Sequence, residues 1–399
     1  MKRRDFLVST GAMVFTAASY GRIMGSNDRL GIAVVGSGRR GRWVLQKFLA
    51  TDKVDVIALC DVWDEQIKRT KDQLQLSKIE LTYDLDEVLS NKRVDAVVLA
   101  TPDHLHKSYA IRILAANKHL FLEKPVTLHY DEGAAIQTAV QNSGMLCQTG
   151  TQQRSGTLYK RVKEEFFTDS KKLGKIIFAR AVWSNFGWQR RAITPRPKPK
   201  HFHWETFLGP SEKLPYEWAR YDAWRNYKEY GTGILSDLLT HWGDVAQWMM
   251  DDAHPLSAVT TGGVYHLKDG RSNPDTVNSI IQYKDGWNFT FECTVMPIKN
   301  THDSVLFHGT EGNLELFRSG YIYTPHTGEQ EKVESTESLD EAHVSNFLDA
   351  VRKGTPLSAP IDVGLNAVKP SHLAASAYWS GQRVKFNEDA TKIIAAHER

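Results

Sequence analysis

The chain has 399 residues, of which 41% are hydrophobic and 24% are charged, values that exclude a disordered or fibrous protein and suggest two or three domains. The formal net charge is +3, and the first 27 residues account for it, so the remaining chain lacks the basic excess of a nucleic-acid-binding protein. Three cysteines without a C-x-x-C pair argue against a disulfide scaffold and a cysteine-based zinc site. We expect no metal.

The N-terminal residues are typical of an export signal. Arg3 and Arg4 precede an uncharged, mildly apolar stretch that ends at Gly21. This pattern resembles a twin-arginine signal, and the stretch is too short and too weakly apolar for a membrane span. We therefore expect residues 1–27 to be a signal and linker. The protein is expected to use the twin-arginine export machinery and to be periplasmic or otherwise exported; a disordered tail is the alternative.

Residues 28–150 alternate short apolar runs with segments of helical periodicity. The expected strands are Leu30–Val35, Val54–Cys60, Val94–Ala100, His119–Leu122 and Met145–Thr149, and the expected helices are Arg42–Ala50, Glu65–Leu76, Ser108–Asn117 and Tyr130–Gly144. Continuous apolar strands separated by helices predict a parallel sheet that is covered on both faces.

Residues 151–399 follow a different pattern and predict a second domain. Lys175–Trp183 alternates between apolar and polar residues. Two pairs of strands flank short turns, Val277–Tyr283 with Trp287–Val295 and Ser304–His308 with Asn313–Phe317. Such hairpins predict a largely antiparallel sheet. Arg190–Lys200 is rich in proline and basic residues and is expected to be a surface loop.

A glycine motif lies between the first strand and the first helix. Gly36, Gly38 and Gly41 form the pattern G-x-G-x-x-G. In a dinucleotide-binding fold the first glycine makes a tight turn, the second lets the backbone approach the pyrophosphate, and the third lets helix and strand pack closely. The helix N-terminus then faces the phosphates. The alternative is a glycine turn that only packs.

Three charged residues bear on the choice of dinucleotide. Asp61 follows the second strand, where a carboxylate accepts hydrogen bonds from the adenosine ribose hydroxyls. It favours NAD over NADP, because a 2′-phosphate would meet a negative charge. Arg39 and Arg40 lie within the glycine motif and keep NADP open, since they can pair with a 2′-phosphate or lie in solvent.

Two further motifs carry ionisable side chains. Glu123-Lys124-Pro125 ends the fourth strand, at the sheet edge where ligands bind, although such a turn alone is more often a surface feature. Asp237 and His241 share a face if their segment is helical, so the carboxylate can orient the imidazole as a general base. Metal ligation and an amphipathic surface helix are the alternatives.

These motifs in this order resemble the glucose–fructose oxidoreductase and inositol dehydrogenase (Gfo/Idh/MocA) family. The matching residues, over about residues 29–385, are Gly36, Gly38, Gly41, Asp61, Thr101, Pro102, His106, Glu123, Lys124, Pro125, Asp237, His241 and Asp244. The resemblance implies an α/β protein with an N-terminal Rossmann domain, residues 28–150. It also implies a C-terminal α+β domain, residues 151–399, with a large, mostly antiparallel open sheet. The free face of that sheet is commonly a subunit contact, so a homo-oligomer is expected.

The resemblance also implies the role of each site residue. Lys124 polarises a substrate hydroxyl, His241 is the acid/base and Asp237 orients it. The implied cofactor-binding residues are Gly36, Gly38, Arg39, Arg40, Gly41, Asp61, Thr101, Pro102, His106, Glu123 and Lys124. The candidate substrate-binding residues are Lys124, Arg154, Trp204, Trp224, Arg225, Asp237 and His241.

We therefore expect an exported oxidoreductase that transfers a hydride between NAD and a hydroxyl of a sugar, polyol or sugar derivative. Outside the cytoplasm no NAD pool recycles a loosely held coenzyme, so a tightly bound cofactor is expected, with residues 22–30 as a candidate clamp. One alternative is an NAD-dependent, redox-neutral glycoside hydrolase, which the retained Glu123-Lys124-Pro125 disfavours. The other is a non-catalytic sugar-binding relative, against which Lys124 and His241 argue.

Overall fold

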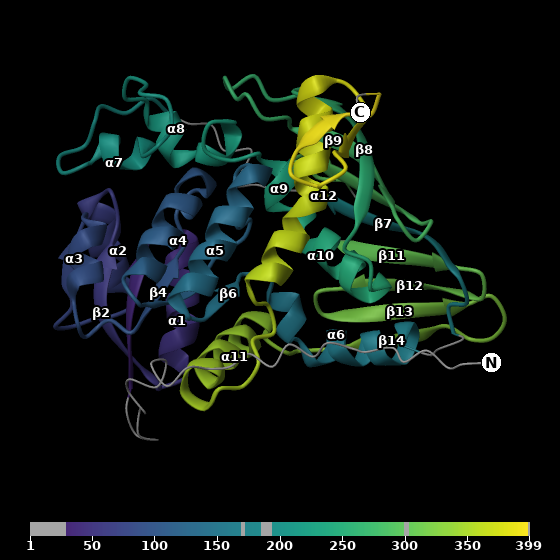
Figure 1. The fold of residues 1–399 in the computed structure, drawn as a ribbon, viewed down its shortest axis with the longest axis horizontal. Helices are drawn as coiled ribbons and strands as arrows, with labels where there is room; N and C mark the ends of the chain where they lie inside the picture. Colours follow the sequence, from purple (N-terminus) through teal and green to yellow (C-terminus); the bar gives the residue numbers. More distant parts are fainter. Residues whose placement is uncertain (1–28, 169–171, 185–193, 299–302, 398–399) are drawn as a thin grey trace, which may run out of the picture.

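The structure, a computed structural model, describes residues 29–168, 172–184, 194–298 and 303–397 and contains two sheets (Figure 1). The expected signal, nearly all of the candidate clamp and the start of the expected Arg190–Lys200 loop lie outside these residues. The described remainder of that loop, up to residue 200, has no regular secondary structure and is mostly exposed, as predicted.

The first sheet has six parallel strands in the order β3-β2-β1-β4-β5-β6. The strands are β1 (Leu30–Val35), β2 (Val54–Cys60), β3 (Glu80–Thr82), β4 (Ala96–Leu99), β5 (His119–Leu122) and β6 (Cys147–Thr149). The helices are α1 (Arg39–Ala50), α2 (Asp64–Gln73), α3 (Leu85–Ser90), α4 (His106–Ala115) and α5 (Gly133–Ser143). The order reverses at β1, and the carboxyl ends of β1 and β4 form the crevice where such sheets bind ligands.

The second sheet has ten strands in the order β14-β13-β12-β11-β7-β10-β9-β8-β15-β16. The strands are β7 (Ile176–Ser184), β8 (Pro255–Gly263), β9 (Thr276–Tyr283), β10 (Asn288–Thr294), β11 (Ser304–Gly309), β12 (Gly312–Phe317), β13 (Gly320–Pro325), β14 (Glu331–Glu334), β15 (Val384–Phe386) and β16 (Ile393–Ala395). Only the β7–β10 pair is parallel among these strands. The predicted fold class, with a mostly antiparallel second sheet, is confirmed.

Helices cover one face of the second sheet, and two of them return to the first sheet (Figure 1). The helices after residue 150 are α6 (Thr157–Val162), α7 (Trp204–Leu208), α8 (Trp218–Asp222), α9 (Ile234–Asp237), α10 (Leu239–Met250), α11 (Leu339–Lys353) and α12 (Ile361–Ser380). Val344 and Phe347 of α11 pack in the core formed by β1 and α1, and Val368 of α12 packs beneath β6 and α5. The C-terminal residues therefore complete the core of the first sheet.

An aromatic cluster joins residues 202–230 to the edge of the first sheet. The cluster contains Trp63, Phe202, Trp204, Phe207, Leu208, Tyr227 and Tyr230, with Tyr216, Trp218, Tyr221 and Trp224 packed against it. Figure 1 shows its helices α7 and α8 above the ends of α2, α4 and α5. Ten aromatic residues thus hold this segment against the first sheet.

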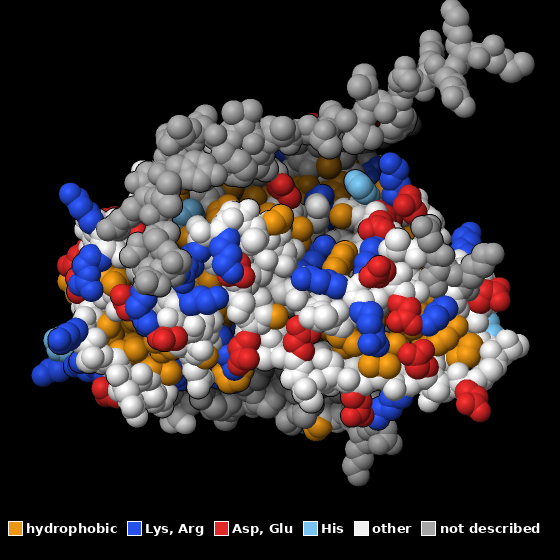
Figure 2. Space-filling model, turned by 90° about the horizontal axis from the view of Figure 1, so that it is seen from below, with side chains coloured by type: hydrophobic (Ala, Val, Ile, Leu, Met, Phe, Trp, Pro, Cys, Tyr) orange, Lys and Arg blue, Asp and Glu red, His pale blue; other side chains and the backbone are white. Residues whose placement is uncertain are grey.

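Surface charge, helix composition and the placement of metal-ligating side chains give three further observations. Figure 2 shows acidic and basic side chains interspersed over the described part of the lower face. None of the helices within the described ranges combines the length and apolar character that a membrane span requires. The same residues contain no group of three or more histidine, cysteine, aspartate or glutamate side chains that could hold a metal ion.

Candidate functional site

The glycine motif forms one wall of a cavity of about 850 Å³ at the carboxyl edge of the first sheet. Gly36 has φ +89°, a left-handed conformation that favours glycine. A Cβ on Gly41 would lie 1.9 Å from the Gly36 carbonyl oxygen, so only glycine allows α1 to pack this closely on β1. A Cβ on Gly38 would meet no atom within 4 Å. The backbone there faces open space at the start of α1, an arrangement that fits a pyrophosphate.

Asp61 lies in the same cavity at the end of β2. Its carboxylate accepts hydrogen bonds from the backbone N–H of Ser37 at 2.8 Å and of Trp63 at 3.3 Å. Burial raises the pKa of Asp61 to about 7, although these backbone donors act in the opposite direction. This position and chemistry fit a carboxylate that binds the ribose hydroxyls of NAD.

The two arginines of the glycine motif lie in different surroundings. Arg39 lines both this cavity and a second, adjoining one. Arg40 lines only the second cavity, and its guanidinium pairs with Glu123 at 2.8 Å and with Asp340 of α11 at 2.9 Å. Arg40 therefore joins the turn after β5 to a C-terminal helix, an ion-pair role that the sequence did not predict.

The aromatic cluster contributes side chains to the wall of the cavity that contains Asp61. The Arg196 guanidinium lies 5.0 Å from the Trp63 ring centroid and 4.8 Å from that of Trp218, and all three side chains line the first cavity. The backbone N–H of His203 donates to the carbonyl of Val62 at 2.8 Å. The segment that carries these residues is therefore attached directly to the loop that follows Asp61.

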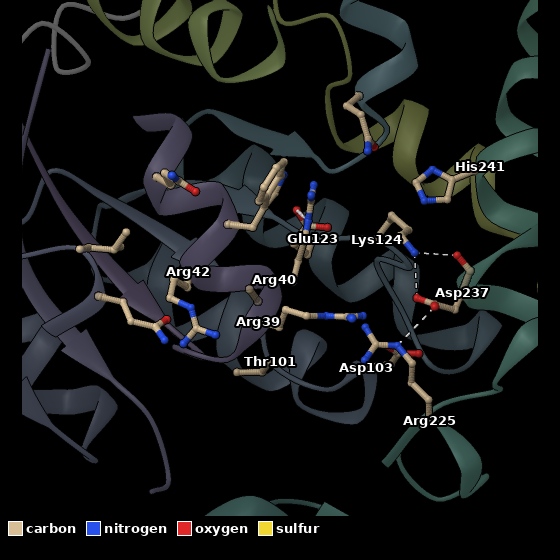
Figure 3. Close-up of a pocket in the computed structure, with 16 residues that line it drawn as sticks. Arg39, Arg40, Arg42, Thr101, Asp103, Glu123, Lys124, Arg225, Asp237 and His241 are labelled. Atoms are coloured by element: carbon tan, nitrogen blue, oxygen red, sulfur yellow. Dashed lines mark hydrogen bonds and ion pairs between the residues drawn. The ribbon is translucent and has the colours of Figure 1, made fainter. Parts of the chain in front are cut away.

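The second cavity, of about 620 Å³, brings together Lys124, Asp237 and His241 (Figure 3). The Lys124 ammonium donates to the backbone carbonyl of Asp237 at 2.6 Å and to its carboxylate at 2.8 Å. The Arg225 guanidinium lies 3.3 Å from the other carboxylate oxygen. Burial alone would raise the pKa of Asp237, but Arg225 and Lys124 lower it to about 2. Asp237 is thus a fixed anion between two cations.

The structure does not show the predicted orienting contact between Asp237 and His241. Helix α9 ends at Asp237, and α10 begins at Leu239 with His241 in its first turn. The two residues therefore do not share one continuous helical face, and the Asp237 carboxylate turns toward Lys124. His241 Nδ1 lies instead 3.3 Å from the side-chain carbonyl oxygen of Gln153. Burial, with help from Lys124, lowers the pKa of His241 well below its usual value, so its imidazole is neutral.

One acidic residue of the second cavity was missed in the sequence. Asp103 is buried beside the Thr101-Pro102 turn after β4 and lines the cavity with Arg225. Burial raises the pKa of Asp103 well above its usual value, while Arg225 acts in the opposite direction. The carboxyl is therefore positioned to hydrogen-bond a polar ligand. Its place four residues beyond the end of β4, at the ligand-binding edge, is the signal that predicts it.

The remaining predicted site residues are placed as follows. His106 is buried, with its ring nitrogens 2.8 Å and 3.0 Å from the backbone carbonyls of Pro125 and Thr101. Pro102 and Trp224 line the first cavity, whereas Trp204 is buried inside the aromatic cluster. Arg154 pairs at 2.7 Å with the buried Asp244 and is not among the residues that line either cavity. The structure therefore does not place Arg154, Trp204 or the predicted cofactor-binding His106 in the lining of either cavity.

Two family models match the chain. One, described as an oxidoreductase family with an NAD-binding Rossmann fold, matches residues 30–151. The other, described as the GFO/IDH/MocA C-terminal domain, matches residues 166–315. Together they cover more than half of the chain.

Several dehydrogenases and oxidoreductases resemble this chain in sequence or in structure. Myo-inositol 2-dehydrogenase of Thermotoga maritima is 26% identical over 90% of this chain and 98% of that protein. The chain spans only 42% of the length of a Bacillus subtilis relative, scyllo-inositol 2-dehydrogenase (NAD(+)), which is 28% identical over 37% of this chain. The solved structure of aldose–aldose oxidoreductase from Caulobacter crescentus, complexed with glycerol, matches with a TM-score of 0.70 at 17% identity and covers 90% of this chain and 100% of that one. The chain therefore belongs to the Gfo/Idh/MocA family of oxidoreductases, and residues 30–151 form its NAD-binding Rossmann domain.

Proposed function

We propose that this protein transfers a hydride between NAD and a hydroxyl-bearing carbon of a sugar, polyol or sugar derivative. One observation carries the proposal: the cavity of Lys124, Asp237 and His241 adjoins the cavity of the glycine motif and Asp61. Arg39, Thr101 and Arg225 line both cavities. A substrate beside Lys124 and His241 therefore lies next to the space that the glycine motif and Asp61 offer to the dinucleotide.

The bound nicotinamide supplies the hydride acceptor or donor. The chain positions the substrate and handles its proton. The Lys124 ammonium, held by Asp237, donates to the substrate hydroxyl oxygen and stabilises negative charge on it. Neutral His241 accepts the hydroxyl proton as the C–O bond becomes a carbonyl, and it returns that proton in the reverse direction. Asp103 and Arg225 offer further hydrogen bonds to the hydroxyls of the substrate.

The experiment uses purified protein with bound NAD and a panel of sugars, polyols and sugar acids, and it follows reduction of the nicotinamide by absorbance. At least one compound is expected to reduce it, and His241→Ala is expected to lower that rate about 10²–10⁴-fold with unchanged NAD binding. Reduction by the panel at equal rates in wild type and His241→Ala would refute the role of His241. Cleavage of a glycoside without net change in the nicotinamide would favour the redox-neutral hydrolase instead.

We also propose that NAD is held tightly. The support is the covering segment, because Arg196, Trp218 and Tyr221 line the adenosine cavity opposite the glycine motif. Contacts between these side chains and a dinucleotide in this cavity would slow its release. NAD or NADH is therefore expected to co-purify with the protein. Freshly purified protein with empty sites would contradict this proposal.

Export and self-association are proposals of the same kind. Arg3, Arg4 and the uncharged stretch after them support twin-arginine export.

Exposed apolar residues on the strands of the second sheet, among them Ile177 and Ile280 at 54% and 50% exposure, support a homo-oligomer through the open sheet face. Light scattering on the purified protein tests the second point, and a monomeric mass at micromolar concentration would reject it.

A further inference from the structure

Gln153 is the hydrogen-bond partner of the candidate base. It lies in the 3₁₀ turn Gln152–Ser155, directly after β6, and its side chain is buried at 0% exposure. Its carbonyl oxygen lies 3.3 Å from His241 Nδ1. Within the described ranges of the chain, no other hydrogen bond to the His241 ring is present. Gln153 is too deeply buried to touch a substrate, so any effect on the reaction must act through His241.

In the structure the Gln153 amide oxygen faces His241 Nδ1, and the amide nitrogen has no hydrogen-bond partner among the described residues. In this orientation the contact favours a proton on Nδ1. A neutral imidazole has one N–H, and a glutamine carbonyl oxygen accepts hydrogen bonds but donates none. The pair therefore forms with the proton on Nδ1, which leaves the lone pair on Nε2. His241 is neutral because it is buried and because Lys124, Arg318 and Arg40 disfavour a positive charge on it.

We propose that Gln153 is a positioning residue that holds His241 as the Nδ1–H tautomer and so makes Nε2 the atom that accepts the substrate proton. The catalytic consequence rests on the proposed function, whereas the tautomer does not. During oxidation the O–H bond of the substrate breaks and an N–H bond forms at Nε2. The resulting imidazolium keeps its Nδ1–H bond to Gln153, and the reverse reaction returns the Nε2 proton.

A neutral amide in this place has a chemical consequence. A carboxylate partner, as the sequence led us to expect from Asp237, would stabilise the imidazolium strongly and slow the return of its proton. Gln153 fixes the tautomer with less stabilisation of the charged form. The site therefore suits a base that must give and take a proton in both directions of a hydride transfer.

The first test reads the tautomer directly and needs no substrate. Long-range ¹H–¹⁵N spectra of histidine-labelled, NAD-loaded protein distinguish the two tautomers, and His241→Ala identifies the signals of His241. Wild type is expected to show Nδ1–H, and Gln153→Met is expected to lose that preference. Gln247→Met is the matched control, because Gln247 is a buried glutamine on α10 that donates to Tyr283 at 3.0 Å. An Nε2–H tautomer in wild type would overturn the proposal.

The second test reads the consequence for turnover. Gln153→Met is expected to lower kcat about tenfold while KM and NAD binding stay unchanged. Gln153→Glu restores an acceptor for Nδ1–H and adds a charge, so it is expected to recover turnover above its own pKa and to raise the kinetic pKa of the base. Unchanged kcat in Gln153→Met, or a Gln153→Glu profile that matches wild type, would overturn the inference. A protein that shows the Nδ1–H tautomer but no turnover would count against the proposed function alone.

Discussion

The contact between Lys124 and Asp237 should be among the strongest polar interactions in the chain, and its strength can be measured. The side chains of the two residues are only 12% and 7% exposed. Lys124 makes one charged hydrogen bond to the Asp237 carboxylate at 2.8 Å and another to its carbonyl at 2.6 Å. A double-mutant cycle of Lys124→Met and Asp237→Asn separates this interaction from the loss of either side chain alone.

The contacts and burial of Lys124 and Asp237 determine the coupling energy that we expect. A hydrogen bond to a charged group contributes about 1.5–3 kcal/mol to stability. Removal of one partner of a buried pair costs about 3–5 kcal/mol when the other charge is left alone. Here Arg225 still faces Asp237 at 3.3 Å, so Lys124→Met should cost less than that, about 2–3 kcal/mol. We expect a coupling energy of about 1.5–3 kcal/mol.

Urea unfolding of nucleotide-free protein, followed by tryptophan fluorescence, provides the four free energies. Because the pKa of Asp237 is lowered to about 2, the stabilisation is present above the usual aspartate pKa and is lost only as the pH falls through about 2. The coupling should therefore be equal at pH 8 and pH 5. The partly exposed Lys353–Asp349 pair, at 3.0 Å on one face of α11, is the control and should give about 0.3–0.5 kcal/mol. A coupling for Lys124 and Asp237 no larger than the control would refute the reasoning.

Three other perturbations test separate parts of the structure. Burial raises the pKa of Asp61 to about 7, and ribose hydroxyls bind its ionised form, so NAD affinity measured by calorimetry should fall up to about tenfold per pH unit below 7. Asp61→Asn should remove this pH dependence. An equal slope in wild type and Asp61→Asn would contradict the assignment of Asp61 to the ribose. Arg196→Ala should speed NAD release about tenfold in a stopped-flow chase. The control is Arg220→Ala, which should leave the release rate unchanged, because Arg220 lies 4.7 Å from the Tyr227 ring but lines neither cavity. Equal release rates in the two variants would exclude a role for Arg196 in NAD retention. Replacement of Arg3 and Arg4 by lysine should keep the protein in the cytoplasm, and unaltered export in cell fractionation would reject that signal.

The elements that the sequence predicted best are those with an apolar run of their own. The structure has β1, β2 and β5 at the predicted residues, because each is a predominantly apolar and buried run. Strand β3 and helix α3 were missed. Glu80–Thr82 is a three-residue edge strand with two exposed side chains, so it carries no hydrophobic pattern. Its pairing with β2 is a tertiary effect that local sequence does not report.

The candidate site likewise contains residues whose positions the sequence predicted and one contact that it did not predict. The glycine motif, Asp61 and Lys124 occupy a strand end each, and a strand end in a parallel sheet fixes where a side chain goes. The partner of His241 could not be predicted, because the segment from Asp237 to His241 reads as one helix but changes direction at Leu238. A break of one residue is enough to turn the Asp237 carboxylate away from the imidazole.

The return of the C-terminal helices to the first sheet has a consequence for how the protein is made. Val344, Phe347 and Val368 complete the core of residues 30–149, yet they are synthesised about two hundred residues after the last strand of that sheet. During translation the nascent Rossmann domain therefore exposes apolar surface that α11 and α12 later cover. Nascent chains with exposed apolar surface aggregate or bind chaperones. Arg40 cannot reach Asp340 until that late helix arrives, so the crevice acquires its final shape only when translation is almost complete. Loading of the dinucleotide should accordingly follow synthesis rather than accompany it, and a translation-arrested chain that ends at residue 300 should fail to retain NAD.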